Sequence, residues 1–225
     1  MTARSYGQFC GIARALDLVG ERWALLVVRE LVLGPKRFTD LQSELPGIGT
    51  NVLSARLREL EQSGVIRRRA LLPPAASTVY ELTEYGRELE EILLELGRWG
   101  LKSMGARRPE QTLRSGWIGL ALRAFARPDV AKGIRETYEF RLDDAVFHAR
   151  TGAGNVLVAG GPAESPDLVV ETGNESLLAL LAGLLDPSDA VSSGQIRLTG
   201  DERLLSRLVE VFRLPAPDVA DALFR

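Results

Sequence analysis

The sequence is poor in the residues that carry most redox and metal chemistry. Its 225 residues include one cysteine, Cys10, and one histidine, His148. A single cysteine cannot form a disulfide within the chain, so we expect a protein of the reducing cytoplasm. Zinc sites take several Cys or His ligands, so no metal site is expected. His148 falls in a predicted strand, where a lone histidine is more often a surface or hydrogen-bonded residue than a ligand.

The sequence also lacks long apolar runs and the common nucleotide and nucleophile motifs. No apolar stretch approaches the ~18–20 residues that span a membrane, and residues 1–9 lack the apolar segment of a secretory signal. Neither a Walker A loop nor a G-x-S-x-G motif occurs. Gly152-Ala-Gly154 lacks the third glycine of a dinucleotide fingerprint, because Leu157 stands there. We therefore expect no membrane partner, no cofactor and no enzyme.

Positive and negative charges are nearly equal in number, but they are unevenly distributed along the chain. The chain has 28 Lys+Arg against 30 Asp+Glu, a formal net charge of -2. Residues 1–108 hold 16 basic and 13 acidic side chains, whereas residues 109–225 hold 12 and 17. Such asymmetry indicates two domains, 1–108 and 109–225, with a polyanion site on the basic side.

The first half has the pattern of four helices, a hairpin and a further helix. Apolar spacing and breakers predict helices over 12–19, 23–33, 38–45 and 51–63, with Thr50 as N-cap and Gly64 as C′ residue of the fourth. Two strands, 65–72 and 77–82, join through a loop at 73–76 and lead into a helix over 84–104 capped by Thr83. This order is that of a winged helix-turn-helix domain, mostly α with a β-hairpin wing.

The fourth helix has two opposite faces. At 100° per residue, Asn51, Ser54 and Arg58 share one face, opposite the apolar side chains Leu53, Leu57 and Leu60. By itself this pattern also suits an ordinary surface helix, but with the turn before it and the Arg-rich hairpin after it the pattern favours a recognition helix in the major groove. The predicted DNA-binding residues are Arg37, Thr50, Asn51, Ser54, Arg56, Arg58, Arg67, Arg68 and Arg69.

Several motifs in residues 8–103 resemble HxlR-type transcriptional regulators. They are Cys10-Gly-Ile-Ala-Arg-Ala-Leu-Asp-Leu-Val-Gly-Glu-Arg-Trp23, Leu31-Val-Leu-Gly-Pro-Lys-Arg-Phe38, Leu45-Pro-Gly-Ile48, Val52-Leu-Ser-Ala-Arg-Leu-Arg-Glu-Leu60, Gly64-Val-Ile-Arg-Arg68 and Tyr80-Glu-Leu-Thr-Glu-Tyr-Gly86. The resemblance implies a homodimer, built largely through terminal helices, that binds pseudo-palindromic double-stranded operator DNA.

Cys10 has two interpretations. Several members of the family use a cysteine at the corresponding place as a sensor of oxidants or electrophiles, but here Gly11 follows it where a proline is common. Reactivity requires exposure and a lowered pKa. With one cysteine per chain, oxidation would link Cys10 to a second copy or to a small thiol; the alternative is an inert, half-buried thiol.

The second half is predicted to be α+β, a mixed sheet covered by helices. We expect helices over 112–126, 176–185 and 201–212 and strands over 138–142, 146–150, 155–159, 167–171 and 195–199, with Asp143-Asp144 as a turn. Asp167-Leu-Val-Val-Glu171 and Gly194-Gln-Ile-Arg-Leu-Thr-Gly-Asp201, with the helix after it, resemble a sterol-carrier-protein-type domain over about residues 130–214. That resemblance implies an apolar tunnel for a lipophilic molecule.

The leucine-rich segment 177–185 is apolar almost all round, so it is either a buried core helix or the lining of a cavity. If a ligand pocket exists, the expected lining is Trp117, Phe140, Phe147, Leu178, Leu181, Leu205, Leu208 and Phe212.

The sequence thus predicts a dimeric DNA-binding regulator whose DNA affinity an apolar small molecule modulates. Two alternatives remain. One is a lipid or small-molecule carrier that uses the winged helix only for dimerisation or docking; the other is a redox sensor acting through Cys10, with a C-terminal domain that binds no ligand.

Overall fold

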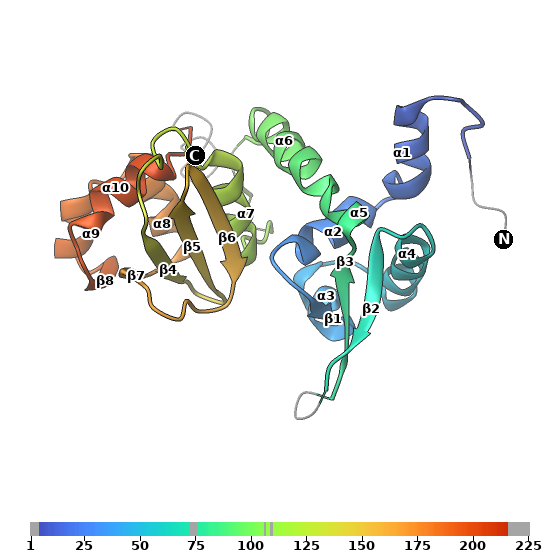
Figure 1. Ribbon diagram of the computed structural model, residues 1–225, viewed down its shortest axis with the longest axis horizontal. Helices are drawn as coiled ribbons and strands as arrows, with labels where there is room; N and C mark the ends of the chain where they lie inside the picture. The colour runs from blue at the N-terminus through green and yellow to red at the C-terminus, as the bar shows by residue number, and fades with distance from the viewer. Residues whose placement is uncertain (1–4, 73–75, 106, 109, 216–225) are drawn as a thin grey trace. The chain divides into compact units, whose positions relative to one another are not determined.

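The computed structural model describes residues 5–72, 76–105, 107–108 and 110–215 and contains two compact units, Met1–Leu93 and Leu94–Arg225 (Figure 1). This division falls within the helix Leu89–Leu101, earlier in the chain than the domain boundary expected at residue 108. The boundary at residue 108 stays a prediction. Most of the expected loop at 73–76, and Pro109 at the expected boundary, lie outside the described residues.

The helices of the first unit enclose one apolar core. Val27 and Val28 are fully buried, as the nearly all-apolar second helix predicts. Leu41 and Leu53, from the next two helices, complete the same cluster. All four predicted helices are confirmed, and no end differs from the predicted one by more than one residue. They are α1 (Gly11–Val19), α2 (Ala24–Val32), α3 (Phe38–Glu44) and α4 (Thr50–Gln62).

The ends of α4 are built differently from each other. The expectation that Thr50 caps the helix is wrong, because Gly49 is the N-cap residue and Thr50 is already helical. At the other end Gly64 has a left-handed φ of 75°, and the Val65 N–H donates to the Leu60 carbonyl at 2.9 Å. This Schellman arrangement ends the helix at the predicted glycine.

A three-stranded antiparallel sheet forms the wing, with strand order β1-β3-β2. The predicted hairpin is present as β2 (Ile66–Ala70) and β3 (Thr78–Leu82), and it projects beyond the helices of its unit (Figure 1). The additional strand β1 (Lys36–Arg37) pairs with the outer edge of β3. Two residues are too short to show a strand period, so the pattern did not predict β1.

The helix predicted over 84–104 is interrupted once. It forms α5 (Glu84–Arg87) and α6 (Leu89–Leu101), separated by Glu88. The predicted cap is confirmed, because the Thr83 hydroxyl oxygen accepts a hydrogen bond from the Gly86 N–H at 3.0 Å. Thr83 also donates its hydroxyl to the Gly64 carbonyl at 2.6 Å, which joins the start of α5 to the end of α4.

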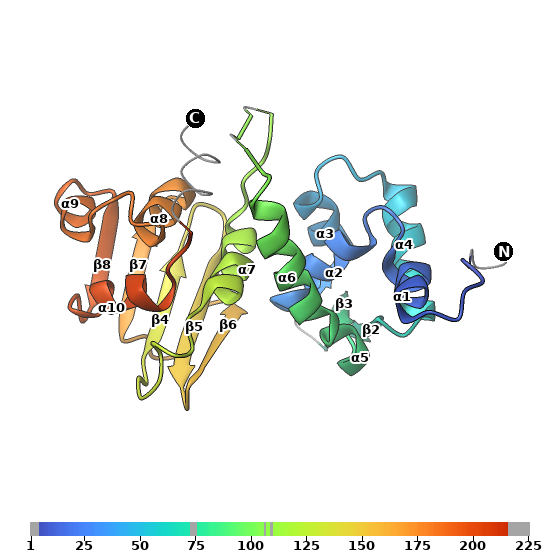
Figure 2. The ribbon, with the colours of Figure 1, turned by 90° about the horizontal axis from the view of Figure 1, so that it is seen from above.

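The second unit is built on a five-stranded mixed sheet with strand order β6-β5-β4-β7-β8 (Figure 2). Only the β4–β7 pair is parallel, which confirms the predicted mixed sheet. The strands are β4 (Thr137–Arg141), β5 (Val146–Gly152), β6 (Asn155–Gly160), β7 (Leu168–Thr172) and β8 (Ile196–Gly200).

Aromatic side chains fill the space between this sheet and its helices. Phe140 and Phe147 stack with ring centroids 5.1 Å apart, and Phe212 meets Phe140 edge to face at 6.2 Å. Such arrangements are the preferred ones for aromatic pairs in cores. The covering helices are α7 (Ser115–Phe125), α8 (Asn174–Leu181), α9 (Pro187–Ser192) and α10 (Leu204–Val211). The pattern did not predict α9, although Asp186 followed by Pro187 is a helix-start signal.

The predicted turn Asp143-Asp144 holds the first residues of two helices. The Asp143 carboxylate accepts from the Asn174 N–H of α8 at 3.1 Å, and the Asp144 carboxylate accepts from the Ser115 N–H of α7 at 3.1 Å. Burial raises the pKa of Asp144, but hydrogen bonds from Ser115 and Arg114 outweigh it and hold that pKa below its ordinary value. One turn therefore supplies an acceptor to both α7 and α8.

We predict that Gly86→Ala strongly destabilises the first unit. A Cβ at this position would lie against the Val65 carbonyl oxygen, closer than two such atoms can approach, and the obstacle is backbone that cannot turn aside. The free energy of unfolding in urea should fall by more than ~2 kcal/mol. Gly11→Ala is the control, because nothing lies within 4 Å of its added Cβ, and it should change stability by no more than ~0.5 kcal/mol. Equal stability of the two variants would contradict the close approach.

Candidate nucleic-acid interface

The helix α4 buries its predicted apolar face and exposes part of the opposite one. Leu53, Leu57 and Leu60 are buried in the core of the first unit. On the other face Asn51 and Arg58 are exposed and Ser54 is half-buried. A recognition helix needs this arrangement, because its back must pack on the domain while its front enters a groove.

The N-terminal end of α4 and the start of α3 add polar groups to the same unit. Thr50 is exposed, and its hydroxyl oxygen accepts a hydrogen bond from the Gln42 side chain at 2.7 Å. Arg37, also exposed, precedes α3, and its backbone N–H donates to the Asp40 carboxylate at 2.9 Å. The first N–H groups of a helix have no partner within the helix and can bind a phosphate. The predicted contact between Thr50 and DNA therefore does not require Thr50 to be the N-cap residue.

Arg56 is turned toward the protein. Only 15% of its side chain is exposed, and it forms ion pairs with Glu59 of α4 and with Glu21, whose carboxylate lies 3.6 Å from Arg56 Nη1. Its predicted contact with DNA stays a prediction. The geometry favours a different task, which is to tie α4 to the segment that joins α1 and α2.

The three wing arginines divide between the two faces of the hairpin. The Nε atoms of Arg67 and Arg69 lie 2.8 Å from the two carboxylate oxygens of Glu81 on β3. Arg68, on the opposite face, pairs with Glu61 of α4 at 2.8 Å. Its guanidinium also lies 5.7 Å from the centre of the Tyr80 ring. All three remain exposed, as a phosphate contact requires.

Two residues near this surface were not among the predicted ones. Val52 is exposed on α4 beside Asn51, where an apolar side chain suits contact with a thymine methyl group. Glu81 is the partner of two wing arginines. The alternation of Arg67 and Arg69 on one strand, facing a strand with a single acidic residue, was a signal for that pairing.

Cys10 is exposed and lies at the N-cap position of α1. The backbone N–H groups of Ala13 and Ile12 lower the pKa of its thiol below the ordinary value, because they favour the negative thiolate; burial opposes this only weakly. The expectation of a half-buried thiol is therefore not met. Exposure and a lowered pKa are the two properties that reactivity requires.

The residues expected to line a ligand pocket lie in the core of the second unit. All of them except Trp117 are buried, among them Phe140 and Phe212 in their edge-to-face contact. The helix α8 is buried on all sides over Leu177–Leu181, as the core-helix interpretation predicts, but it ends there, and Leu184 of the predicted segment 177–185 is exposed. Two of the surface hollows formed by described residues of this unit are lined by none of these side chains. The pocket stays a prediction.

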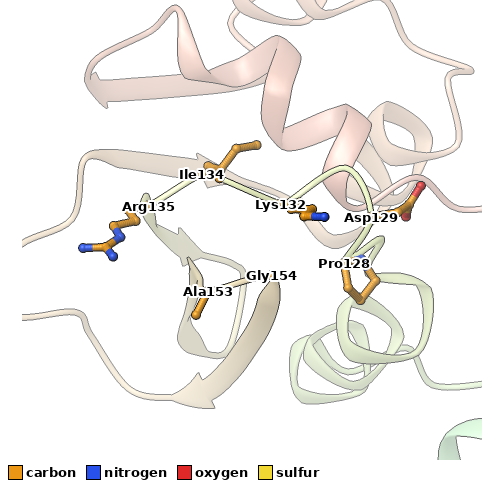
Figure 3. A pocket seen from close by; sticks show the side chains of 8 residues that line it. Pro128, Asp129, Lys132, Ile134, Arg135, Ala153 and Gly154 are labelled. Atoms are coloured by element: carbon orange, nitrogen blue, oxygen red, sulfur yellow. The ribbon is translucent and has the colours of Figure 1, made fainter.

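The larger of these hollows has a volume of about 650 Å³. Figure 3 shows the segment from Pro128 to Arg135 on one side of it and the Ala153–Gly154 turn on the other. The smaller, of about 350 Å³, lies around Arg107 and the first residues of α8. The lining of the larger hollow includes the exposed cations Lys132 and Arg135.

The last candidate residue is His148, and it makes a hydrogen bond within the sheet domain. His148 is half-buried, and its Nδ1 lies 2.9 Å from the Gly161 carbonyl oxygen. Within the described part of the chain, no group of three His, Cys, Asp or Glu side chains could hold a metal ion. Among those same residues, no helix has the length and apolar character needed to cross a bilayer.

Two family models match the chain. The HxlR-like helix-turn-helix family matches residues 18–108, and the SCP-2 sterol transfer family matches residues 120–213. The first match contains α2 to α6 with the wing, and the second contains the five-stranded sheet.

Individual relatives agree with the first match. The HTH-type transcriptional regulator YdeP of Bacillus subtilis is 37% identical over 93 residues, which are 41% of this chain and 73% of that protein. YodB of the same organism, also an HTH-type transcriptional regulator, is 36% identical over 85 residues, or 38% and 76%. The solved structure of reduced YodB is 34% identical and covers 41% of this chain and 92% of its own, with a TM-score of 0.38.

We predict that Arg58→Ala weakens binding to a specific DNA duplex. Arg58 is exposed on α4, where a guanidinium can donate two hydrogen bonds to guanine, and its loss should cost ~1–3 kcal/mol in a gel-shift titration. Arg87→Ala, which removes an exposed arginine from α5, controls for the lost charge and should have a smaller effect. Unchanged affinity of the Arg58 variant would remove α4 as the recognition helix.

Proposed function

The chain belongs to the HxlR-like helix-turn-helix family of transcriptional regulators, and on this premise we propose that its winged helix binds double-stranded operator DNA as a homodimer. The observation that carries the proposal is α4, which buries Leu53, Leu57 and Leu60 and exposes Asn51 and Arg58. Arg can read guanine and Asn adenine through paired hydrogen bonds in the major groove. Such a regulator acts in the cytoplasm and catalyses no reaction.

Dimeric helix-turn-helix proteins read two half-sites about one DNA turn apart, roughly 34–36 Å from centre to centre. A homodimer therefore suits a pseudo-palindromic operator. The wing arginines Arg67 to Arg69 would contact phosphates, which position the protein without reading sequence.

The dependence of DNA binding on salt tests this function. Contacts between arginines and phosphates release counterions, so the affinity for a duplex should fall steeply and log-linearly as salt rises. A carrier that uses its winged helix only for docking has no need of an arginine-rich wing beside a polar helix face. Absence of DNA binding at low salt would favour that carrier.

The dimer is supported by apolar side chains that are exposed on two helices. Ile12 and Leu16 are exposed on α1, and Ile92, Leu96 and Trp99 are exposed on α6. Trp99, at 69% exposure, is a large apolar side chain to leave in water. Contiguous exposed apolar faces mark interfaces, and the family resemblance assigns dimerisation to the terminal helices.

We predict that the purified protein has twice the chain mass in light scattering at micromolar concentration. Trp99→Glu should shift it toward the monomer, because a carboxylate in an apolar interface loses its hydration without a partner. Leu157→Glu is the control, since Leu157 is also exposed but lies on β6 of the sheet, and it should stay dimeric. A wild-type protein that is monomeric would contradict the dimer.

The C-terminal domain is proposed to bind a lipophilic small molecule that modulates DNA affinity. The proposal is supported by the match to the SCP-2 sterol transfer family. A ligand can regulate only if it binds one spacing of the two recognition helices better than another. The helix α6 runs from one unit into the other and is a continuous connection for such coupling. Mass spectrometry of the natively purified protein tests for a co-purifying lipophile.

A second candidate function is oxidant sensing through Cys10. It is favoured by the exposure of Cys10 and its position at the N-terminus of α1. One solved structure bears on it by name. The redox regulator HypR in its oxidized form is 33% identical, with a TM-score of 0.39, and the match covers 41% of this chain and 96% of that one. Oxidation by peroxide would remove two protons and two electrons from the Cys10 thiols of two chains and form a disulfide.

If Cys10 is a sensor, Cys10→Ser should abolish the loss of DNA binding that peroxide or a quinone causes in the wild type. The serine hydroxyl keeps the size of the side chain but cannot form a disulfide or a thiol adduct. DNA affinity without oxidant is the internal control and should be equal in both proteins. Identical oxidant responses would remove the sensing role.

A further inference from the structure

We propose that Glu81 is a positioning residue for DNA binding, which holds Arg67 and Arg69 together as one phosphate-binding pair on the wing. The inference rests on the proposed function, because it concerns how the wing meets DNA. It assigns a task to an acidic residue within an arginine-rich hairpin, where net charge alone would count it as unfavourable.

The hairpin register brings the three side chains to one face. Arg67 lies directly opposite Glu81 across the β2–β3 pair, and Arg69 lies opposite Val79, two residues along the same strand. Residues two apart on a strand point to the same side, so both arginines flank the one carboxylate. The Nε of Arg67 lies 2.8 Å from Glu81 Oε1, and the Nε of Arg69 lies 2.8 Å from Oε2.

These contacts leave a donor surface free for a further acceptor. Both contacts use the Nε atom, so the pairing with Glu81 does not take up the two terminal nitrogens of either guanidinium, and these nitrogens can donate to a phosphate oxygen. The side chains of Arg67 and Arg69 are 62% and 45% exposed, whereas that of Glu81 is 9% exposed. The carboxylate thus lies beneath two guanidinium groups that face solvent.

The carboxylate is also present in its charged form. The hydrogen bond from Arg69 lowers the pKa of Glu81, burial raises it, and the hydrogen bond from Arg67 lowers it further, so the pKa lies below its ordinary value. One negative and two positive charges leave this cluster with a net charge of +1. Without Glu81 the two arginines would repel each other, and each long side chain would sample many rotamers.

Positioning and net charge predict opposite effects of removing the carboxylate. Replacing Glu81 by glutamine adds one positive charge to the wing, so attraction to DNA through charge alone should strengthen binding. If Glu81 positions the arginines, the same change should weaken binding to a preferred duplex, because their ordering must then be completed on the DNA.

The experiment compares full-length variants on two DNA probes. One probe is a duplex enriched from a random library by the wild-type protein, and the other is a random-sequence duplex. Dissociation constants are measured by fluorescence anisotropy over a range of salt concentrations, and circular dichroism melting confirms that each variant is folded. Glu84→Gln is the matched control, because it makes the same charge change at an exposed residue of α5.

We expect Glu81→Gln to bind the enriched duplex on the order of tenfold more weakly than the wild type, while Glu84→Gln binds as well or slightly better. The double variant Arg67→Lys with Arg69→Lys should also bind more weakly, since lysine keeps the charge but lacks the planar fork that Glu81 orients. Glu81→Gln binding as tightly as Glu84→Gln would overturn the inference.

Two further outcomes are decisive. If Glu81→Gln does not fold, the double lysine variant decides, and full affinity of that variant overturns the inference. If the wild-type protein enriches no duplex, the proposed DNA-binding function fails and the inference fails with it. A wild type that binds DNA beside an unaffected Glu81→Gln separates failure of the inference from failure of the function.

Discussion

The first unit depends on the burial of one face of α4. Leu53, Leu57 and Leu60 are almost completely buried, and each contributes roughly 1.5–3 kcal/mol by leaving water. Because that face is held in the core, the rotation of the helix about its axis is fixed, and the outward direction of Asn51 and Arg58 follows. The polar face therefore owes its position to apolar contacts that lie on the other side of the helix.

Much of the fold follows from the sequence because it depends on local signals. Apolar spacing, the break at Gly34-Pro35 and the glycine at residue 64 determine helix limits through the chain near them. The alternation of apolar and polar residues in β5 similarly reports which face of the sheet is buried. These signals lie within a few residues of the structure that they describe, so the two kinds of domain could be predicted.

Features that depend on distant partners could not be predicted in this way. The strand β1 exists because Lys36 and Arg37 meet β3, more than forty residues later in the chain. In the sequence Arg56 looks like a DNA contact. In the structure it pairs with Glu21, in the segment between α1 and α2. The predicted pocket residues share an apolar character that suits a cavity lining and a filled core equally, and only packing distinguishes the two.

The turn at Asp143-Asp144 has a consequence for how the second unit assembles. Asp144 lies 29 residues after Ser115, and Asp143 lies 31 residues before Asn174. Their carboxylates accept hydrogen bonds from the backbone N–H groups of those two residues. Neither α7 nor α8 carries this acceptor in its own sequence, so a peptide containing either helix alone would begin without it. The two helices acquire a complete N-terminus only when the hairpin of β4 and β5 has formed, which makes their folding mutually dependent through a turn that belongs to neither.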